Sequence, residues 1–152
     1  GTLSTRSSAG STFITEASDV TIDSVSVLTH NVLSTGALHG TDNTVTQEDL
    51  VTVGTNSVLV VQAGGLLTVN AGSAGTGVDA SGNVLLKTTN SGNIALATGL
   101  TSAGNVSLDA AGNVTQSAIG NITLTGSGMS LDVLASGDIT MNATAVSQTK
   151  QG

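Results

Sequence analysis

The stretch "AGNVTQSAIGNITLTG", residues 111 to 126, contains nearly the same pattern twice: Gly, Asn, a β-branched aliphatic residue and Thr. Around each aliphatic residue the side chains alternate between apolar and small or hydroxylic, which is the period of a short strand with one buried face. A helix is disfavoured, because Gly recurs every few residues and Val, Ile, Thr and Asn form helices less readily than Ala. The stretch therefore predicts short strands joined by tight corners.

The motif recurs through the second half of the chain. We expect the Gly-Asn step to form the corners, because Gly accepts a positive φ and the Asn side chain can bond nearby backbone groups. If the corners stack on one another, the Asn side chains would form hydrogen bonds between neighbouring turns of the chain. The aliphatic anchors are Val84, Ile94, Val106, Val114, Ile122, Met129 (in the degenerate copy Met129-Ser130-Leu131) and Ile139. The expected turn and ladder residues are Gly82, Asn83, Gly92, Asn93, Gly104, Asn105, Gly112, Asn113, Gly120, Asn121, Gly137 and Asp138.

Stacked coils account for this pattern better than hairpins do. Such short strands with a single aromatic residue, Phe13, would make a thin sandwich, whereas stacked coils bury a continuous aliphatic core along an axis. If two motif copies make one turn, a coil has roughly 18 residues, and the chain holds about eight coils in a rod about 40 Å long. We therefore expect an all-β fold, a parallel β-helix or β-solenoid.

The first half lacks the clean motif but keeps alternating apolar residues. Val20, Ile22, Val25 and Val27 are spaced for short strands, as are the pairs Val58/Val60 and Leu67/Val69. Residues 34–50 are the least regular part, and we expect an irregular loop or excursion from the rod there. No change of composition marks a second domain, so residues 1–152 are expected to form a single β-solenoid domain.

Composition excludes several classes of function. The net charge is −7, with only three Lys and Arg residues, so we expect no nucleic-acid partner, because binding to phosphates needs clustered basic residues. No apolar run reaches the roughly 20 residues that span a bilayer, so we expect no membrane insertion. Cys is absent, which fits secretion and excludes thiolate-bound metals.

Residues 82 to 141 resemble the repeat regions of filamentous-haemagglutinin-like exoproteins and related giant bacterial surface proteins. The segments "SAGNVSLDAAGNVTQSAIGNITLTG" (102–126) and "SGDITMNATA" (136–145) follow the pattern G-[ND]-[IV]-[ST]-L of that family, and the first 80 residues follow it loosely. The resemblance implies a right-handed parallel β-helix, secretion to the outer surface of a bacterial cell, and a role as a stalk, adhesin or filament.

Catalytic and metal-binding functions have weak support in the sequence. Pectin-lyase-type enzymes share the expected architecture, but they need grouped carboxylates with a basic residue, and here the carboxylates are scattered. We therefore expect no enzymatic activity and no cofactor. His30, His39, Asp42, Glu48 and Asp49 could in principle ligate zinc or calcium, but their spacing matches no recognised loop. We interpret them as part of a solvated acidic loop and expect no metal site.

Four N-glycosylation sequons occur, at Asn105, Asn113, Asn121 and Asn142. Three of them fall inside the repeat, so the repeat itself generates them. We expect Asn ladders at these positions, and glycan attachment is the alternative interpretation.

The preferred hypothesis is a non-catalytic, secreted structural protein at the cell surface: a β-helical shaft, an adhesin stalk or a self-stacking extracellular filament subunit. No charged or Pro-containing cap is evident at either terminus, which predicts end-to-end stacking with another copy or with further repeats of a longer chain. The alternative is an adhesin module that binds a cell-surface or matrix glycan through residues 34–50.

Overall fold

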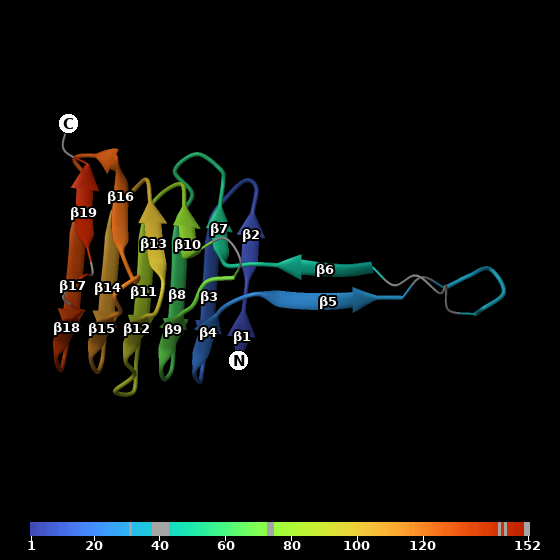
Figure 1. Ribbon diagram of the computed structural model, residues 1–152, viewed down its shortest axis with the longest axis horizontal. Helices are drawn as coiled ribbons and strands as arrows, with labels where there is room; N and C mark the ends of the chain where they lie inside the picture. Colours follow the sequence, from blue (N-terminus) through green and yellow to red (C-terminus); the bar gives the residue numbers. More distant parts are fainter. Residues whose placement is uncertain (31, 38–42, 73–74, 143, 145, 151–152) are drawn as a thin grey trace.

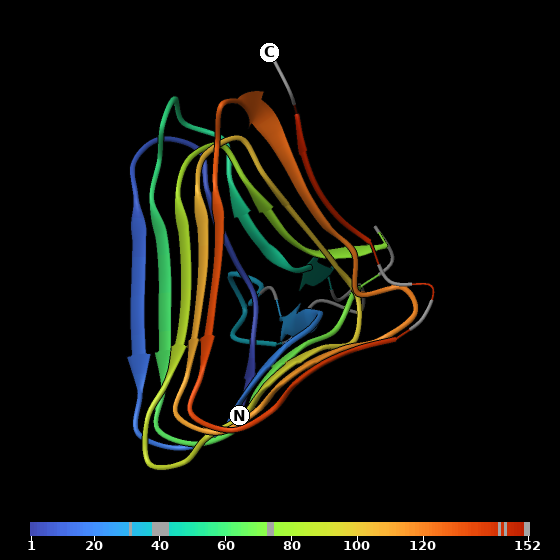
Figure 2. The ribbon, with the colours of Figure 1, turned by 90° about the vertical axis from the view of Figure 1, so that its left-hand side faces the viewer.

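The computed structural model describes the chain except residues 31, 38–42, 73–74, 143, 145 and 151–152. The regular elements of the described chain are all β-strands. Three parallel sheets form the faces of a rod with a triangular cross-section, seen end-on in Figure 2. The all-β, parallel architecture expected from the repeat is confirmed.

Each face of the rod stacks its strands in the order in which they follow one another along the chain. Face 1 contains β1 (Thr2–Leu3), β4 (Val20–Ile22), β9 (Leu67–Val69), β12 (Ile94–Leu96), β15 (Val114–Gln116) and β18 (Ile139–Met141). Face 2 contains β2 (Thr5–Ser7), β7 (Leu50–Thr52), β10 (Thr76–Ala80), β13 (Gly99–Ser102), β16 (Ile122–Ser127) and β19 (Ser147–Lys150). Face 3 contains β3 (Thr12–Glu16), β8 (Leu59–Ala63), β11 (Val84–Thr88), β14 (Val106–Ala110) and β17 (Leu131–Ala135).

One coil contains three strands, because the chain visits faces 1, 2 and 3 in turn. Ile94 pairs with Val114, 20 residues later, and Leu67 pairs with Ile94, 27 residues later. The expected coil of roughly 18 residues is therefore too short, because it assumed two strands per turn. Six stacked strands on face 1, spaced by about 4.8 Å, also give six coils rather than eight in the described chain. We number the coils 1 to 6 from the N-terminus; β1–β3 form coil 1, and coil 6 contains β18 and β19.

The core is a column of aliphatic side chains that runs along the axis of the rod. Strand alternation sends every second residue inward, so that in β14 Val106 and Leu108 are buried while Ser107 lies on the outer surface. Twenty-one hydrophobic residues of the described chain are buried in this single cluster: Val20, Ile22, Leu50, Leu59, Val61, Ala63, Leu67, Val69, Val78, Ala80, Val84, Leu86, Ile94, Leu96, Leu100, Val106, Leu108, Ala110, Val114, Ile122 and Leu124.

Two expected anchors have the wrong phase. Leu59 and Val61 of β8 are buried, whereas Val60 and the preceding residue Val58 are half-exposed. The run is apolar in both phases, so only the pairing of Leu59 with Val84 decides which side chains face inward. Near the C-terminus, Leu131 takes the place expected for Met129, because Leu131 pairs with the buried Val106.

A two-stranded arm leaves the rod at the corner between faces 1 and 2 of coil 2. It consists of β5 (Val25–Thr29) and β6 (Asn43–Gln47), which pair antiparallel. Figure 1 shows that the arm runs along the stacking direction and extends past β1 and β2 beyond the N-terminal end of the rod. The expected excursion at residues 34–50 thus contains β6 and the start of β7, as well as residues 38–42, which lie outside the described part.

The motif glycines are required for close approach between coils. We expected them to provide a positive φ, but among the described glycines only Gly10, Gly36, Gly75 and Gly128 have one. A Cβ atom on Gly92 would instead lie 2.2 Å from the Gly65 carbonyl oxygen in the preceding coil. The corners of neighbouring coils are therefore too close together for any side chain at this position.

Candidate functional site

The most regular constellation of polar side chains is a hydrogen-bonded ladder at the corner between faces 3 and 1. Asn93 Oδ1 accepts a hydrogen bond from the backbone N–H of Asn113 at 2.7 Å, and Asn113 Oδ1 accepts one from the N–H of Asp138 at 2.8 Å. Asn93 and Asn113 each stand directly before a strand of face 1. Their side chains therefore lie beside the backbone N–H of the residue at the same corner of the next coil. The ladder therefore satisfies corner N–H groups that the sheets leave unpaired.

A second ladder follows the corner between faces 2 and 3. Asn83 Oδ1 accepts the N–H of Asn105 at 2.8 Å, and Asn105 Oδ1 accepts the N–H of Ser130 at 2.8 Å. At the third corner, between faces 1 and 2, Asn121 Oδ1 accepts the N–H of Val146 at 2.9 Å. The structure thus distributes the expected Gly-Asn steps over all three corners.

Some ladder positions lack the Gly-Asn motif and were not predicted from the sequence. Asp19 Oδ1 accepts the N–H of Leu66 at 2.8 Å, and Ser11 Oγ accepts the N–H of Val58 at 3.0 Å. Ser11 directly precedes β3 and Asp19 directly precedes β4, as the motif Asn residues directly precede their strands. A short oxygen-bearing side chain at that point is the signal that could have identified them.

Gln116 is a buried polar residue in the otherwise aliphatic interior of face 1. It occupies the position of Leu96 in the coil before, and its Nε2 donates to the carbonyl oxygens of Gly120 at 2.7 Å and of Val146 at 3.1 Å. It therefore satisfies carbonyl groups of two neighbouring coils at the corner between faces 1 and 2.

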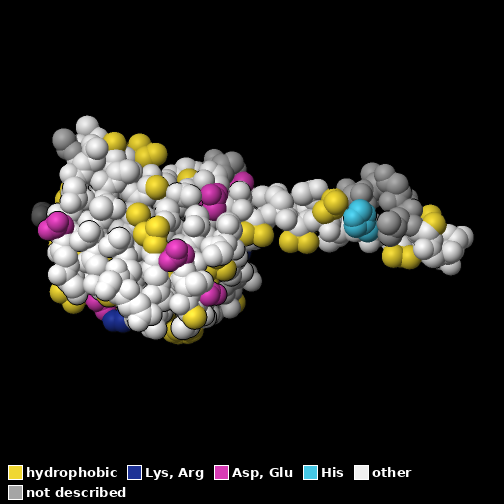
Figure 3. Space-filling model, turned by 90° about the horizontal axis from the view of Figure 1, so that it is seen from below, with side chains coloured by type: hydrophobic (Ala, Val, Ile, Leu, Met, Phe, Trp, Pro, Cys, Tyr) yellow, Lys and Arg dark blue, Asp and Glu magenta, His cyan; other side chains and the backbone are white. Residues whose placement is uncertain are grey.

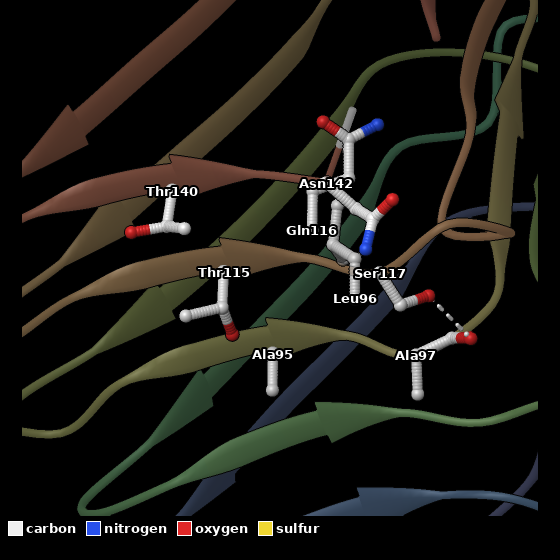
Figure 4. Close-up of a pocket in the computed structure, with 8 residues that line it drawn as sticks. All are labelled: Ala95, Leu96, Ala97, Thr115, Gln116, Ser117, Thr140 and Asn142. Carbon is white, nitrogen blue, oxygen red and sulfur yellow. Dashed lines mark hydrogen bonds between the residues drawn. The ribbon is translucent and has the colours of Figure 1, made fainter. Parts of the chain in front are cut away.

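A shallow hollow of about 280 Å³ lies on the outer surface near this corner (Figure 4). Ala95 and Ala97 make it hollow, because small side chains stand there beside Thr115 and Ser117 of the next coil. Ser117 Oγ donates to the Ala97 carbonyl oxygen at 2.9 Å, as the dashed line in Figure 4 shows. No residue in the lining carries a charge, so this hollow can offer a ligand only neutral hydrogen bonds and apolar contact.

Outward-facing positions of face 1 form a file of hydroxyl side chains. Thr2, Thr21, Thr68, Thr115 and Thr140 are in register on successive strands, and Ala95 alone interrupts the file. On face 3, Lys87 and Asp109 form a salt bridge between adjacent coils. This ion pair links two coils at the surface, where such a pair contributes about 0–1 kcal/mol.

A buried carboxylate stands at the base of the arm. Asp49 is 3% exposed and has a φ of 60°, and its Oδ1 accepts the N–H of Gly72 at 2.8 Å. Burial raises the pKa of Asp49 above its ordinary value. The Gly72 hydrogen bond opposes this rise, and the nearby carboxylates of Glu48 and Asp23 add to it.

The five residues considered as metal ligands in the sequence, His30, His39, Asp42, Glu48 and Asp49, are only partly described. His39 and Asp42 lie outside the described residues. Elsewhere in the described ranges, no three His, Asp or Glu side chains come close enough together to hold a metal ion. Residues 105, 113, 121 and 142, the sequon Asn positions, are all exposed, and glycan attachment to them stays a prediction.

The described residues also contain no helix with the length and hydropathy of a membrane span. Comparison of the chain with protein families, with curated proteins and with solved structures gives no match. The resemblance to filamentous-haemagglutinin-like repeats therefore rests on the motif residues of the segment from 82 to 141.

Proposed function

We propose that the chain is a secreted, non-catalytic shaft at a bacterial cell surface, built as a right-handed parallel β-helix of filamentous-haemagglutinin-like repeats. Such a shaft acts as an adhesin stalk or as the subunit of an extracellular filament. The observation that carries the proposal is the continuous aliphatic core, flanked at all three corners by side-chain hydrogen bonds between successive coils. Right-handed crossovers are the rule for parallel strands, which supports the proposed hand.

The mechanical role follows from the way in which the coils are joined. Backbone hydrogen bonds of three sheets and the corner bonds all run from one coil to the next, so a load along the axis is shared among many bonds. No single coil can bury its apolar face alone, which is why stacked coils form one stable unit. A shaft needs this property and no reactive group.

Single-molecule force spectroscopy tests the shaft. The chain is placed between two reference domains and stretched. We expect force-resistant unfolding with a released length on the order of 500 Å, since an extended chain spans about 3.5 Å per residue. A chain that extends without resistance would contradict a mechanical role.

The second candidate function is adhesion through the arm, and the exposure of the arm favours it. Val27, Leu28 and Val45 are all more than half exposed on β5 and β6, and Figure 3 shows apolar side chains along the arm. A two-stranded ribbon is marginally stable alone in water, so contact with a partner would stabilise it. The partner expected from the sequence is a cell-surface or matrix glycan.

Replacing residues 25–47 by a short Gly-Ser turn tests this candidate, because it removes the arm and leaves every strand of the three faces. We expect the circular dichroism spectrum to keep its β-type minimum and the variant to lose binding to a glycan array that the intact chain binds. Equal binding by both chains would assign recognition to the rod.

A further inference from the structure

The inward-facing side chains of coil 1 differ in kind from those of the coils that follow. On face 3, Thr12 is in register with the buried Leu59, and Glu16 is in register with the buried Ala63. On face 2, Thr5 is in register with the buried Leu50. Coil 1 therefore places hydroxyls and a carboxylate at positions where coil 2 places aliphatic groups.

Ser7 is also polar, but its partner in coil 2, Thr52, is likewise a buried hydroxyl residue, and an aliphatic residue at this position, Ala80, follows one coil further. Only Leu3 and Ile14 continue the aliphatic columns of their faces into coil 1, and both are half-exposed. The aliphatic core thus comes to an end within this coil.

Glu16 lies at the coil 1 end of the aliphatic core, where hydrogen bonds fix its carboxylate. Its Oε1 accepts hydrogen bonds from the Ser18 N–H at 3.2 Å and from Ser18 Oγ at 3.0 Å, and these bonds lower the pKa of Glu16. Glu16 also lines a cavity of about 120 Å³ at this end, together with Leu3, Ile14 and Val20. An ionised carboxylate therefore lies where the next aliphatic side chain of a stacked coil would have to fit.

The opposite end is chemically different on two faces. Leu131, Val133, Ile139 and Met141 line an almost wholly apolar cavity of about 130 Å³ there, with Ser147 on the third face. No carboxylate belongs to its lining. At this end the aliphatic columns of faces 1 and 3 continue outward.

We propose that coil 1 is an end cap: its polar inward side chains prevent another coil from stacking on it, so that copies of the chain do not join head to tail. The physical reason is that a stacked coil would remove the Glu16 carboxylate and the Thr5 and Thr12 hydroxyls from water, and burying a charge and polar groups against aliphatic side chains costs free energy. Inward-pointing charges protect sheet edges from pairing in other β-proteins, and solenoids need polar terminal repeats. This inference rests on the proposed β-helical shaft and narrows it: coil 1 resists stacking of another copy, and the arm extends past this coil.

The absence of native Cys permits a clean cross-linking test. Thr2 and Thr140 are outward-facing ends of one file on face 1, so a head-to-tail stack would bring Thr140 of one copy within about 5 Å of Thr2 of the next. The full-length double variant Thr2→Cys/Thr140→Cys is treated with a short bismaleimide. We expect no ladder of trimers and larger species, and a ladder would overturn the proposal.

Removing the cap should produce the ladder. The substitutions Thr12→Val and Glu16→Ala, added to the two cysteines, make coil 1 resemble coil 2 on face 3. The matched control, Thr15→Val with Asp79→Ala, also replaces one Thr by Val and one carboxylate by Ala, but at outward-facing positions, and it should give no ladder. If the Thr12→Val/Glu16→Ala variant loses its β-type circular dichroism spectrum, the single substitution Glu16→Ala is tested in its place. Its side chain is exposed, so the variant should fold, and it should also give a ladder. A folded cap variant without a ladder would overturn the proposal.

A separate variant distinguishes failure of the cap from failure of the shaft. Thr115 and Thr140 are paired on adjacent strands of face 1, so Thr115→Cys/Thr140→Cys should cross-link within one chain. Absence of this internal cross-link would refute the stacked file itself, whereas its presence together with a ladder from the Thr2/Thr140 pair would refute the cap alone.

Discussion

Individual side chains in this rod are specified most strictly at its corners, where backbone N–H groups leave the sheets. Asn113 both donates its N–H to Asn93 and accepts the N–H of Asp138, so it joins three coils. Polar side chains inside the rod, such as Ser102 and Gln116, also donate to corner carbonyl groups. The polar residues within this aliphatic repeat thus form hydrogen bonds with backbone groups at the corners, which would cost free energy if they were left unpaired.

Asn113→Ala should lower the free energy of unfolding by about 0.5–1.5 kcal/mol, because the N–H of Asp138 loses its acceptor. Chemical denaturation measures the change. Asn142→Ala is the control, since the Asn142 side chain bonds Thr144 in its own loop, and it should change stability less. Equal effects would show that the ladder bond adds nothing to the stability of the rod.

Asp49→Asn tests the buried carboxylate at the base of the arm. The folded state raises the pKa of Asp49, so ionised Asp49 opposes folding, and this cost disappears as the pH falls through the folded pKa towards the ordinary Asp value of about 3.9. Asn keeps an acceptor for the Gly72 N–H and tolerates the positive φ. We therefore expect the variant to have a Tm at pH 7 equal to or above that of the parent chain.

The difference in Tm between the Asp49→Asn variant and the parent should narrow as the pH is lowered to about 4, because the parent then gains the proton that relieves the cost. Asp79→Asn, at an exposed outward position, serves as the control and should leave stability within about 0.5 kcal/mol. A variant at position 49 with a lower Tm at pH 7 would mean that the charge makes a favourable contact.

At the scale of the elements, the sequence predicts the strands that follow a Gly-Asn step, including β16 on face 2, and misses β10 and β13 of the same face. Val84, Ile94, Val106, Val114 and Ile122 are all buried anchors, as the motif predicts. The strands β10 and β13 follow no such step, so the motif alone suggests two strands per coil. Their signal is a longer repeat, "TGVDASGN" at residues 76–83 and "TGLTSAGN" at 98–105, whose 22-residue spacing equals the register of Val78 with Leu100.

The arm shows why the local sequence pattern alone does not assign a strand to its sheet. The segment around Val25 and Val27 alternates like a rod strand, yet it pairs antiparallel with Asn43–Gln47 outside the three faces. Alternation reports that a segment is extended, and it carries no information about the sheet to which the segment belongs. Placement depends on long-range pairing, which no short window of sequence contains.

The close contact between neighbouring coils at the corner glycines predicts the effect of substituting these glycines on stability. Gly92→Ala should destabilise the protein by about 1–3 kcal/mol, because its Cβ would meet the Gly65 carbonyl oxygen at 2.2 Å. Gly99→Ala is the matched control, since a Cβ there would have its nearest contact at 3.5 Å. Thermal melts of the two variants should therefore separate clearly, and similar melting temperatures would contradict close coil-to-coil contact at the Gly92 corner.

For the whole molecule, stability is expected to depend on position along the axis, because each coil contacts only its neighbours. Leu96 is 1% exposed and lies in register between Val69 and Gln116, so coils on both sides cover it. Leu131 is half-buried, and in the described part of the chain it has a paired neighbour on one side only, at Val106. A Leu side chain therefore contacts two neighbouring coils in the middle of the rod, at Leu96, and one neighbouring coil near the C-terminal end, at Leu131.

Leu96→Ala should lower the free energy of unfolding by about 2–5 kcal/mol, the usual cost of a fully buried Leu, and Leu131→Ala by roughly half as much or less. Denaturant titration gives both values, and amide hydrogen exchange should show slower exchange in coils 3 to 5 than in coil 6. The two variants are matched in chemistry, so their difference isolates the number of covering coils. Equal losses, together with uniform exchange, would instead mean that the rod unfolds as a single unit in which position along the axis has no effect.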